Sequence, residues 1–139
     1  MSKTTKVSKV MTGQVIVAEV NNSIQQIQDL FIEYDMHHIP VVNEGRVIGI
    51  ISQTDLLKCY DKLMKSGDSV SADNVNSKYS VESVMTKKPI SVAPVTSLAT
   101  ASDMMVEHHC HSLPVVEHGQ IVGILTARDV VRFVAETED

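Results

Sequence analysis

An internal repeat constrains the fold of this chain more than any other feature of its sequence. The tripeptide Val-Met-Thr at residues 10–12 recurs at 84–86, and Pro-Val-Val at 40–42 recurs at 114–116, so each pair is 74 residues apart. Gly49 and Asp55 recur at the same spacing as Gly123 and Asp129. The copies align without a gap from residue 7 to residue 57 of the first copy. We therefore predict two copies of one supersecondary unit that share a core, because one copy alone would bury little surface.

The first half of each copy is predicted to be a short strand and a helix. Apolar residues at 15–17 and 90–92 favour the strand. In the first copy Ser23 stands three residues before Gln26, the pattern of a capping box, and residues 24, 27, 30, 31 and 34 then form an apolar face. In the second copy Ser97 is the corresponding N-cap. The apolar face there continues to His108, which we expect to be packed.

The second half of each copy is predicted to be a β-hairpin and a closing helix. Gly45 and Gly119 lie between two apolar segments and are predicted to supply the positive φ of the turns. The closing helices are predicted to begin near Thr54 and Arg128. The fold class is therefore α/β (α+β), with a β-α-β-β-α order in each copy.

The two copies define the expected domain organisation. Repeat 1 covers residues 7–65, a connector covers 66–80, and repeat 2 covers 81–136. Residues 66–76 are polar and rich in Ser, Asn, Asp and Gly, which is typical of a flexible connector.

Composition excludes several classes of function. The formal net charge of −5 argues against nucleic-acid binding, which needs a basic surface. No apolar run approaches the ~18 residues of a membrane span, and no apolar region follows the first lysines to form a signal peptide. Two cysteines make no disulfide framework. We therefore expect a cytoplasmic protein that binds neither nucleic acid nor a membrane.

The sequence shows no motif for catalysis or for a metal centre. It has no Gly-rich P-loop, no nucleophile elbow and no zinc-protease helix. Histidines cluster at residues 37–38 and 108–111, but consecutive side chains point in different directions and rarely close around one ion. Cys59 and Cys110 are expected to be inert apolar residues. We therefore predict no enzyme activity, no catalytic residues, no metal and no cofactor.

Each copy carries a hydroxyl and an acid three residues apart, Ser52 with Asp55 and Thr126 with Asp129. One interpretation is a capping box, which needs no ligand. A carboxylate can also accept two hydrogen bonds from a vicinal diol, and a helix N-terminus favours a phosphate nearby. The two interpretations are compatible.

Together, these motifs resemble the CBS domain, the family named after cystathionine β-synthase. The resemblance rests on Val-Met-Thr at the start of each copy, on Pro-Val-Val, and on the closing motifs at 49–55 and 123–129. It implies a Bateman module, in which two repeats pack about a pseudo-twofold axis through their sheets. It further implies a regulatory protein that binds AMP, ADP, ATP or S-adenosylmethionine in a cleft between the repeats, forms a homodimer, and transmits the change to a partner protein. The alternative is a ligand-free dimerisation or protein-interaction module.

The resemblance also implies roles for individual residues. Asp55 and Asp129 would accept hydrogen bonds from the ribose, with Ser52 and Thr126 reaching sugar or phosphate. Arg128 would hold the phosphate, where the first copy has Thr54, so the two clefts are expected to differ. His37, His38 and His111 would touch phosphate or cover the cleft. The predicted adenine slot contains Ile16, Val17, Ile39, Pro40, Pro89, Ile90, Ser91, Leu113 and Pro114, although core packing explains most of these equally well.

Overall fold

The computed structural model describes residues 4–137 and divides into two compact units. Unit 2 consists of residues 16–88, and unit 1 consists of the residues up to Val15 together with those from Pro89 onward. Each unit is a mixed α+β structure with its own core, as predicted for the fold class.

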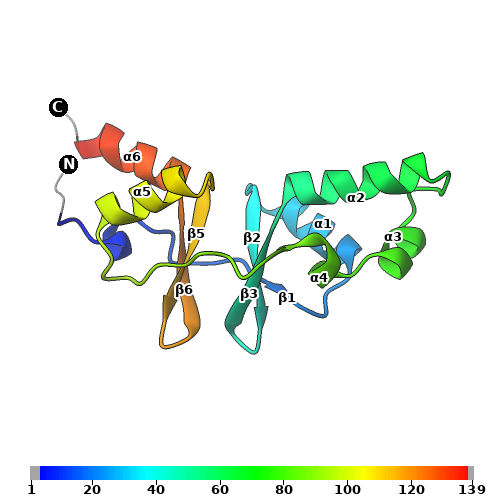
Figure 1. Cartoon of the computed structure of the whole chain (residues 1–139), viewed down its shortest axis with the longest axis horizontal. Coiled ribbons are helices and arrows are strands. Elements are labelled where there is room, and N and C mark those ends of the chain that lie inside the picture. Colours follow the sequence, from blue (N-terminus) through cyan, green and yellow to red (C-terminus); the bar gives the residue numbers. More distant parts are fainter. Residues whose placement is uncertain (1–3, 138–139) are drawn as a thin grey trace. The chain divides into compact units, whose positions relative to one another are not determined.

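Unit 2 is built on a four-stranded sheet in the order β1-β2-β3-β4. Strand β1 pairs in parallel with β2, whereas β2–β3 and β3–β4 are antiparallel. Helices α1 and α2 lie on the same side of the β2–β3 hairpin (Figure 1), and helices α3 and α4 follow α2. The bounds are β1 (Ala18–Glu19), α1 (Ile24–Glu33), β2 (His38–Asn43), β3 (Arg46–Ser52), α2 (Gln53–Lys65), α3 (Ala72–Lys78), α4 (Val81–Val84) and β4 (Thr86–Lys87).

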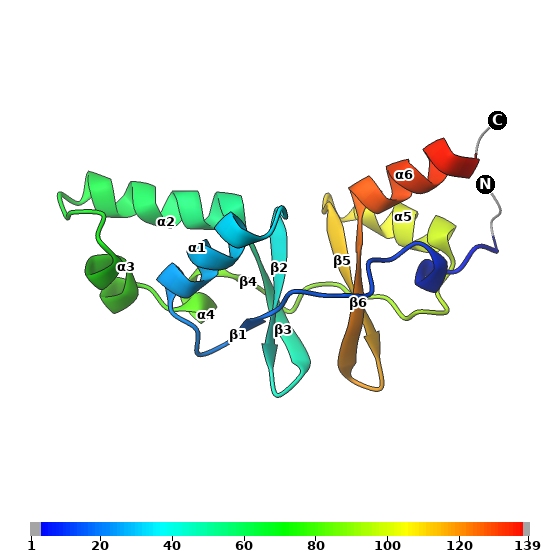
Figure 2. The same ribbon diagram turned by 180° about the vertical axis from the view of Figure 1, so that it is seen from behind.

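Unit 1 repeats this plan around the β5–β6 hairpin. Helices α5 and α6 lie on one side of the hairpin, and the segment that follows η1 runs beside β6 (Figure 2). Thr12 forms an antiparallel bridge with Ile124 of β6, and Val92 forms a parallel bridge with Val115 of β5. The bounds are η1 (Val7–Lys9), α5 (Leu98–Glu107), β5 (Ser112–Glu117), β6 (Gln120–Thr126) and α6 (Ala127–Thr137).

The compact units do not coincide with the repeats of the sequence. The start of the first copy belongs to unit 1 with the second hairpin, and the start of the second copy supplies β4 to unit 2. In each unit, a glycine of the hairpin allows the segment from the other copy to lie this close to the strand. A Cβ at Gly49 would lie 2.9 Å from the backbone oxygen of Thr86, and one at Gly123 would lie 3.0 Å from that of Thr12. Each hairpin therefore closes on the opening segment of the other copy.

The predicted caps and turns are confirmed. Ser23 caps α1 in a complete capping box with Gln26, and Ser97 caps α5. Gly45 has φ of 80° and Gly119 has φ of 78°. The residue before each glycine also has positive φ, which makes both turns type I′ and matches the twist of a hairpin.

Three local predictions were wrong. The first strand is Ala18–Glu19 rather than residues 15–17, and residues 90–92 contribute only the bridge of Val92. His108 is the C-cap of α5 and is exposed rather than packed, because the helix ends there. The connector, expected to be turn-rich and flexible, contains the capped helix α3.

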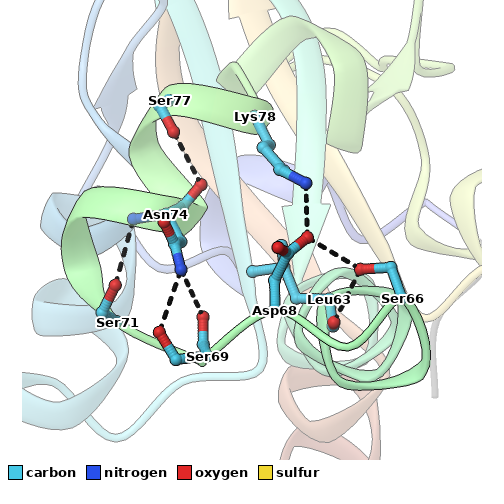
Figure 3. A network of polar contacts seen from close by, with 8 residues as sticks. All are labelled: Leu63, Ser66, Asp68, Ser69, Ser71, Asn74, Ser77 and Lys78. Carbon is cyan, nitrogen blue, oxygen red and sulfur yellow. Dashed lines mark hydrogen bonds and ion pairs between the residues drawn. The ribbon is translucent and has the colours of Figure 1, made fainter.

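The connector is ordered by a network of polar contacts (Figure 3). Asp68 accepts hydrogen bonds from the ammonium group of Lys78 and from Ser66 Oγ, and these two bonds lower the pKa of the Asp68 carboxyl below its usual value. Asn74 Nδ2 donates to the backbone oxygen and to Oγ of Ser69, at 2.9 Å and 3.0 Å. Helix α3 also buries Val75 completely in the core of unit 2, so this part of the connector belongs to that unit.

Candidate functional site

The candidate site of unit 1 lies where β6 passes into α6. Thr126 ends the strand, and its backbone N–H donates to Asp129 Oδ2 at 3.0 Å. The N–H of Asp129 donates in turn to Thr126 Oγ1 at 3.1 Å. This is the reciprocal geometry of a capping box, so the capping interpretation of the pair is correct in the folded chain. The remaining acceptor capacity of the carboxylate is available to other donors.

A second hydroxyl reaches the same carboxylate from the beginning of the chain. Thr12 Oγ1 lies 3.3 Å and 3.4 Å from the two carboxylate oxygens of Asp129, and it donates to them. The bridge between Thr12 and Ile124 holds the threonine beside β6. Asp129 is only 8% exposed, so the hydroxyl of Thr12 and the backbone N–H of Thr126 compensate for the burial of the carboxylate. Thr12 was not among the predicted site residues, although its recurrence as Thr86 could have indicated it.

Unit 2 contains the equivalent junction between β3 and α2. The N–H of Ser52 donates to Asp55 Oδ2 at 2.8 Å, and the N–H of Asp55 donates to Ser52 Oγ at 3.1 Å. Thr86 pairs with Ile50 of β3, just as Thr12 pairs with Ile124 of β6. The side chain of Asp55 is half-buried, whereas that of Asp129 is buried. The two junctions therefore share their backbone design but differ in how far the carboxylate is open to solvent.

The first turns of α2 and α6 differ in charge. Arg128 lies in the first turn of α6 and is exposed, and Thr54 is exposed at the equivalent place in α2. The guanidinium of Arg128 is suited to bidentate contact with a phosphate, which the hydroxyl of Thr54 cannot make. The two helix starts therefore differ in charge, and unequal binding at them stays a prediction.

The three predicted histidines lie at or just before the first strand of each hairpin. The carbonyl of His37 accepts from the backbone N–H of Gln53 at 3.2 Å, and the carbonyl of His111 accepts from that of Ala127 at 2.8 Å. Both backbones are thus tied to the first residue of the following helix. The His37 and His111 side chains are exposed, whereas His38, the first residue of β2, is half-buried.

The predicted adenine-slot residues divide between the two units. In unit 2, Ile16 and Val17 lead into β1, which pairs with β2. In unit 1, Val92 lies beside β5, since its N–H donates to the carbonyl of Pro114 at 3.0 Å. In each unit, the chain at the end of the predicted first strand is therefore a neighbour of the Pro-Val-Val strand of the same copy. Fully buried members are Ile39 and Leu113; Pro40 and Pro114 are also buried, Ile16, Val17, Pro89 and Ile90 are half-buried, and Ser91 is exposed.

The described residues give little support for a metal site or for a reactive thiol. Within residues 4–137, no three His, Cys, Asp or Glu side chains are grouped closely enough to hold a metal ion. Burial raises the pKa of the Cys59 thiol and that of the Cys110 thiol, so both remain largely protonated near neutral pH. None of the helices in the described part of the chain is long and apolar enough to cross a membrane.

Comparison with known proteins gives one consistent result. The family model for the CBS domain matches residues 7–62 and 81–136. Protein MJ1404 of Methanocaldococcus jannaschii is 30% identical over 138 residues, which are 96% of this chain and 33% of that protein. The chain likewise spans 45% of MJ1225 from the same organism, so it matches only part of these relatives.

Two solved structures resemble the chain over most of its length. The structure of CBSX2 in complex with AMP has a TM-score of 0.80 and 27% identity, and the match covers 97% of this chain and 99% of that one. The CBS domain pair of MJ0100, in complex with 5′-methylthioadenosine and S-adenosyl-L-methionine, has a TM-score of 0.76 and 25% identity, with coverage of 93% and 98%.

Proposed function

Because this chain belongs to the CBS domain family, we propose that it is a regulatory module that binds an adenosine-containing ligand without turning it over. The observation that carries the proposal is the similarity to the AMP complex of CBSX2, which extends over nearly the whole of both chains. The MJ0100 pair binds two further molecules that contain adenosine. The adenosine moiety is what these ligands share, so it defines the class of ligand.

The proposed binding groups are those of the two strand-to-helix junctions. The carboxylates of Asp55 and Asp129 accept hydrogen bonds from the ribose hydroxyls, as a carboxylate does from a vicinal diol. The hydroxyl of Thr12 donates a hydrogen bond to the Asp129 carboxylate, and the hydroxyl of Thr126 accepts one from the Asp129 backbone N–H. Both hydroxyls can exchange these hydrogen bonds for contacts with a ligand. The apolar residues beside the Pro-Val-Val strands supply the adenine slot.

Arg128 distinguishes the two junctions in this proposal. It holds the phosphate of AMP, ADP or ATP at the start of α6, where the helix dipole also favours negative charge. The junction of unit 2 has Thr54 instead and relies on Asp55, which is more open than Asp129. We therefore propose that the ligand with a phosphate prefers the junction of unit 1. In this proposal, a partner protein responds to the binding of the ligand.

Isothermal titration calorimetry with AMP, adenosine and GMP tests the proposal. AMP should bind, and Arg128→Gln should weaken AMP at least about tenfold, since a charge-assisted contact contributes about 1.5–3 kcal/mol. Adenosine lacks the phosphate and should bind both proteins alike. Arg132→Gln, which removes an exposed arginine from the next turn of α6, is the matched control. Asp129→Asn keeps one side-chain oxygen that can accept the N-cap hydrogen bond, and it should weaken the binding of both AMP and adenosine.

A ligand-free interaction module is the second candidate, favoured by one observation. Both carboxylates already accept hydrogen bonds within the folded chain, so neither needs a ligand to be satisfied. Absence of binding by AMP, adenosine and S-adenosylmethionine at millimolar concentration would establish this alternative and refute the regulatory-ligand proposal. Binding of GMP as tight as that of AMP would refute the adenine slot.

A further inference from the structure

A polar depression lies in unit 2 where the start of α1 faces the end of α3 and the start of α4 (Figure 2). Its volume is about 700 Å³, which is within the range of about 300–1,000 Å³ for small-molecule sites. Four of its eleven lining residues carry a carboxamide, so we name it the amide depression. It shares no residue with the strand-to-helix junctions, since its lining consists of residues 20–23, Gln26, residues 76–80 and Ser83.

The amide depression exists because two segments of unit 2 are not joined by their backbones. Backbone hydrogen bonds tie the equivalent segments of unit 1 together; in one of them the N–H of Val7 donates to the carbonyl of Thr96 at 2.8 Å. In the described part of the chain, no backbone hydrogen bond joins the corresponding segments of unit 2, residues 79–83 and 20–24. The amide depression lies between these two segments and has residues of both in its lining.

The carboxamides of the lining are held in place by their oxygens. Gln26 Oε1 accepts from the backbone N–H of Ser23 at 2.9 Å, and Asn76 Oδ1 accepts from that of Gln25 at 3.1 Å. Neither Gln26 Nε2 nor Asn76 Nδ2 donates to any other residue within 4–137. Two positioned amide groups therefore keep their donors for a ligand, and groups that are already in position lose less entropy on binding.

Hydroxyl and aromatic side chains complete the lining. Ser77 Oγ donates to the backbone oxygen of Asn74 at 3.1 Å and keeps its lone pairs as acceptors. Tyr79 and Val20 are half-buried and pack against the core of unit 2, so they supply the apolar part of the lining. The amide depression thus combines donors, acceptors and one aromatic ring that has a polar end.

The charge of the lining favours a neutral ligand. Lys78 is the one charged residue among those that line the amide depression, and its ammonium group is paired with the carboxylate of Asp68 (Figure 3). An anion would have to compete with this carboxylate for the ammonium group. A cation would find no acidic side chain in the lining. Electrostatic complementarity therefore disfavours ligands of either sign.

We propose that the amide depression binds a neutral polyhydroxylated molecule, which is a sugar or a cyclic polyol. The amide groups of Gln26 and Asn76 donate to its hydroxyl oxygens, the serine hydroxyls accept from its hydroxyl protons, and Tyr79 packs against the carbon atoms of its ring. Every hydroxyl of such a ligand both donates and accepts, which matches the mixed lining. The proposal does not depend on nucleotide binding at the strand-to-helix junctions.

NMR titration of the isotope-labelled full chain with glucose, trehalose and myo-inositol tests the proposal. At millimolar concentration, at least one of these probes should cause saturable shifts of the side-chain amide signals of Gln26 and Asn76. The backbone signals of Asp55 and Asp129 should stay in place, and inorganic phosphate should not shift the two amide signals. The proposal is overturned if none of the three probes causes a saturable shift, if phosphate shifts the amide signals instead, or if the probes act at the junctions.

The variant Gln26→Glu separates ligand binding from helix capping. Glutamate keeps an oxygen for the N–H of Ser23, and Ser-x-x-Glu is itself a capping box, so α1 should stay capped. Glutamate lacks the amide donors, so the probe that binds the wild type should bind about three- to tenfold more weakly, as expected for one lost neutral hydrogen bond. Gln28→Glu makes the same change on α1 outside the lining and is the matched control. Equal affinity of the two variants for the probe overturns the proposed contact.

Discussion

The replacement Gly49→Ala tests whether β4 from the second copy is packed against β3 as closely as the structure shows. An added Cβ would lie 2.3 Å from Met85 Sδ and 2.9 Å from the backbone oxygen of Thr86, whereas ordinary contact begins at 3.4 Å. The sulfur can swing away, but the oxygen belongs to the paired strand. The strand must therefore move by about 0.5 Å, the difference between 3.4 Å and 2.9 Å. Overpacking of this kind costs about 1–3 kcal/mol, and the stiffer unfolded chain returns about 0.4–1 kcal/mol. We expect a net loss of about 1–2 kcal/mol in the free energy of unfolding.

Urea denaturation followed by circular dichroism measures this loss. Gly13→Ala is the control, because nothing lies within 4 Å of a Cβ at Gly13. That replacement should leave stability unchanged or raise it by about 0.4–1 kcal/mol. If Gly49→Ala is as stable as Gly13→Ala, the close approach of β4 to β3 is refuted.

Three further predictions concern the connector and a thiol. Val75→Ala should lower the free energy of unfolding by about 1–2 kcal/mol in urea denaturation, because Val75 is fully buried. Val70→Ala, at an exposed position of the connector, should have little effect. Equal effects of the two replacements would show that α3 is not packed on the core. Lys78→Met should raise the lowered pKa of the Asp68 carboxyl, which an NMR titration measures, and an unchanged pKa would exclude the ion pair. Since the folded-state pKa of Asp68 is lowered, the pair stabilises the wild type above the unfolded-state pKa, and this advantage over Lys78→Met should disappear as the pH falls through the folded-state value. Cys59, whose pKa is raised by burial, should react with iodoacetamide at neutral pH much more slowly in the native protein than in urea; equal rates would contradict its placement in the core.

Features set by local chemistry could be predicted from the sequence. Ser23, Ser52 and Ser97 cap their helices because an N-cap needs only a hydroxyl beside a few backbone N–H groups. The hairpin turns at Gly45 and Gly119 follow from a residue type that tolerates positive φ. The strand-to-helix junctions at Asp55 and Asp129 follow from the same local rules.

Features set by distant contacts could not be predicted. Helix α3 is seven residues long and buries only Val75, so its sequence has no periodic apolar pattern that would predict a helix. The stability of α3 comes from packing on the core of unit 2. The pairing of each Val-Met-Thr segment with the hairpin of the other copy could not be predicted from the sequence either. Both copies begin with the same Val-Met-Thr, so each segment could pair with the hairpin of its own copy or with that of the other copy. The contact of Thr12 with Asp129 depends on that exchange.

The exchange of opening segments has a consequence for synthesis of the protein. Val7 and Thr12 leave the ribosome before unit 2 does, whereas their partners in β6 and α5 leave it after unit 2. Unit 2 is complete as soon as residue 88 has emerged, and it can fold during translation, whereas the opening segment must wait. Val7, fully buried in the folded protein, therefore stays exposed on the nascent chain until α5 and β6 have emerged. A message truncated before β6 would yield a folded unit 2 preceded by a segment without its partners, and chaperones and proteases engage segments of this kind.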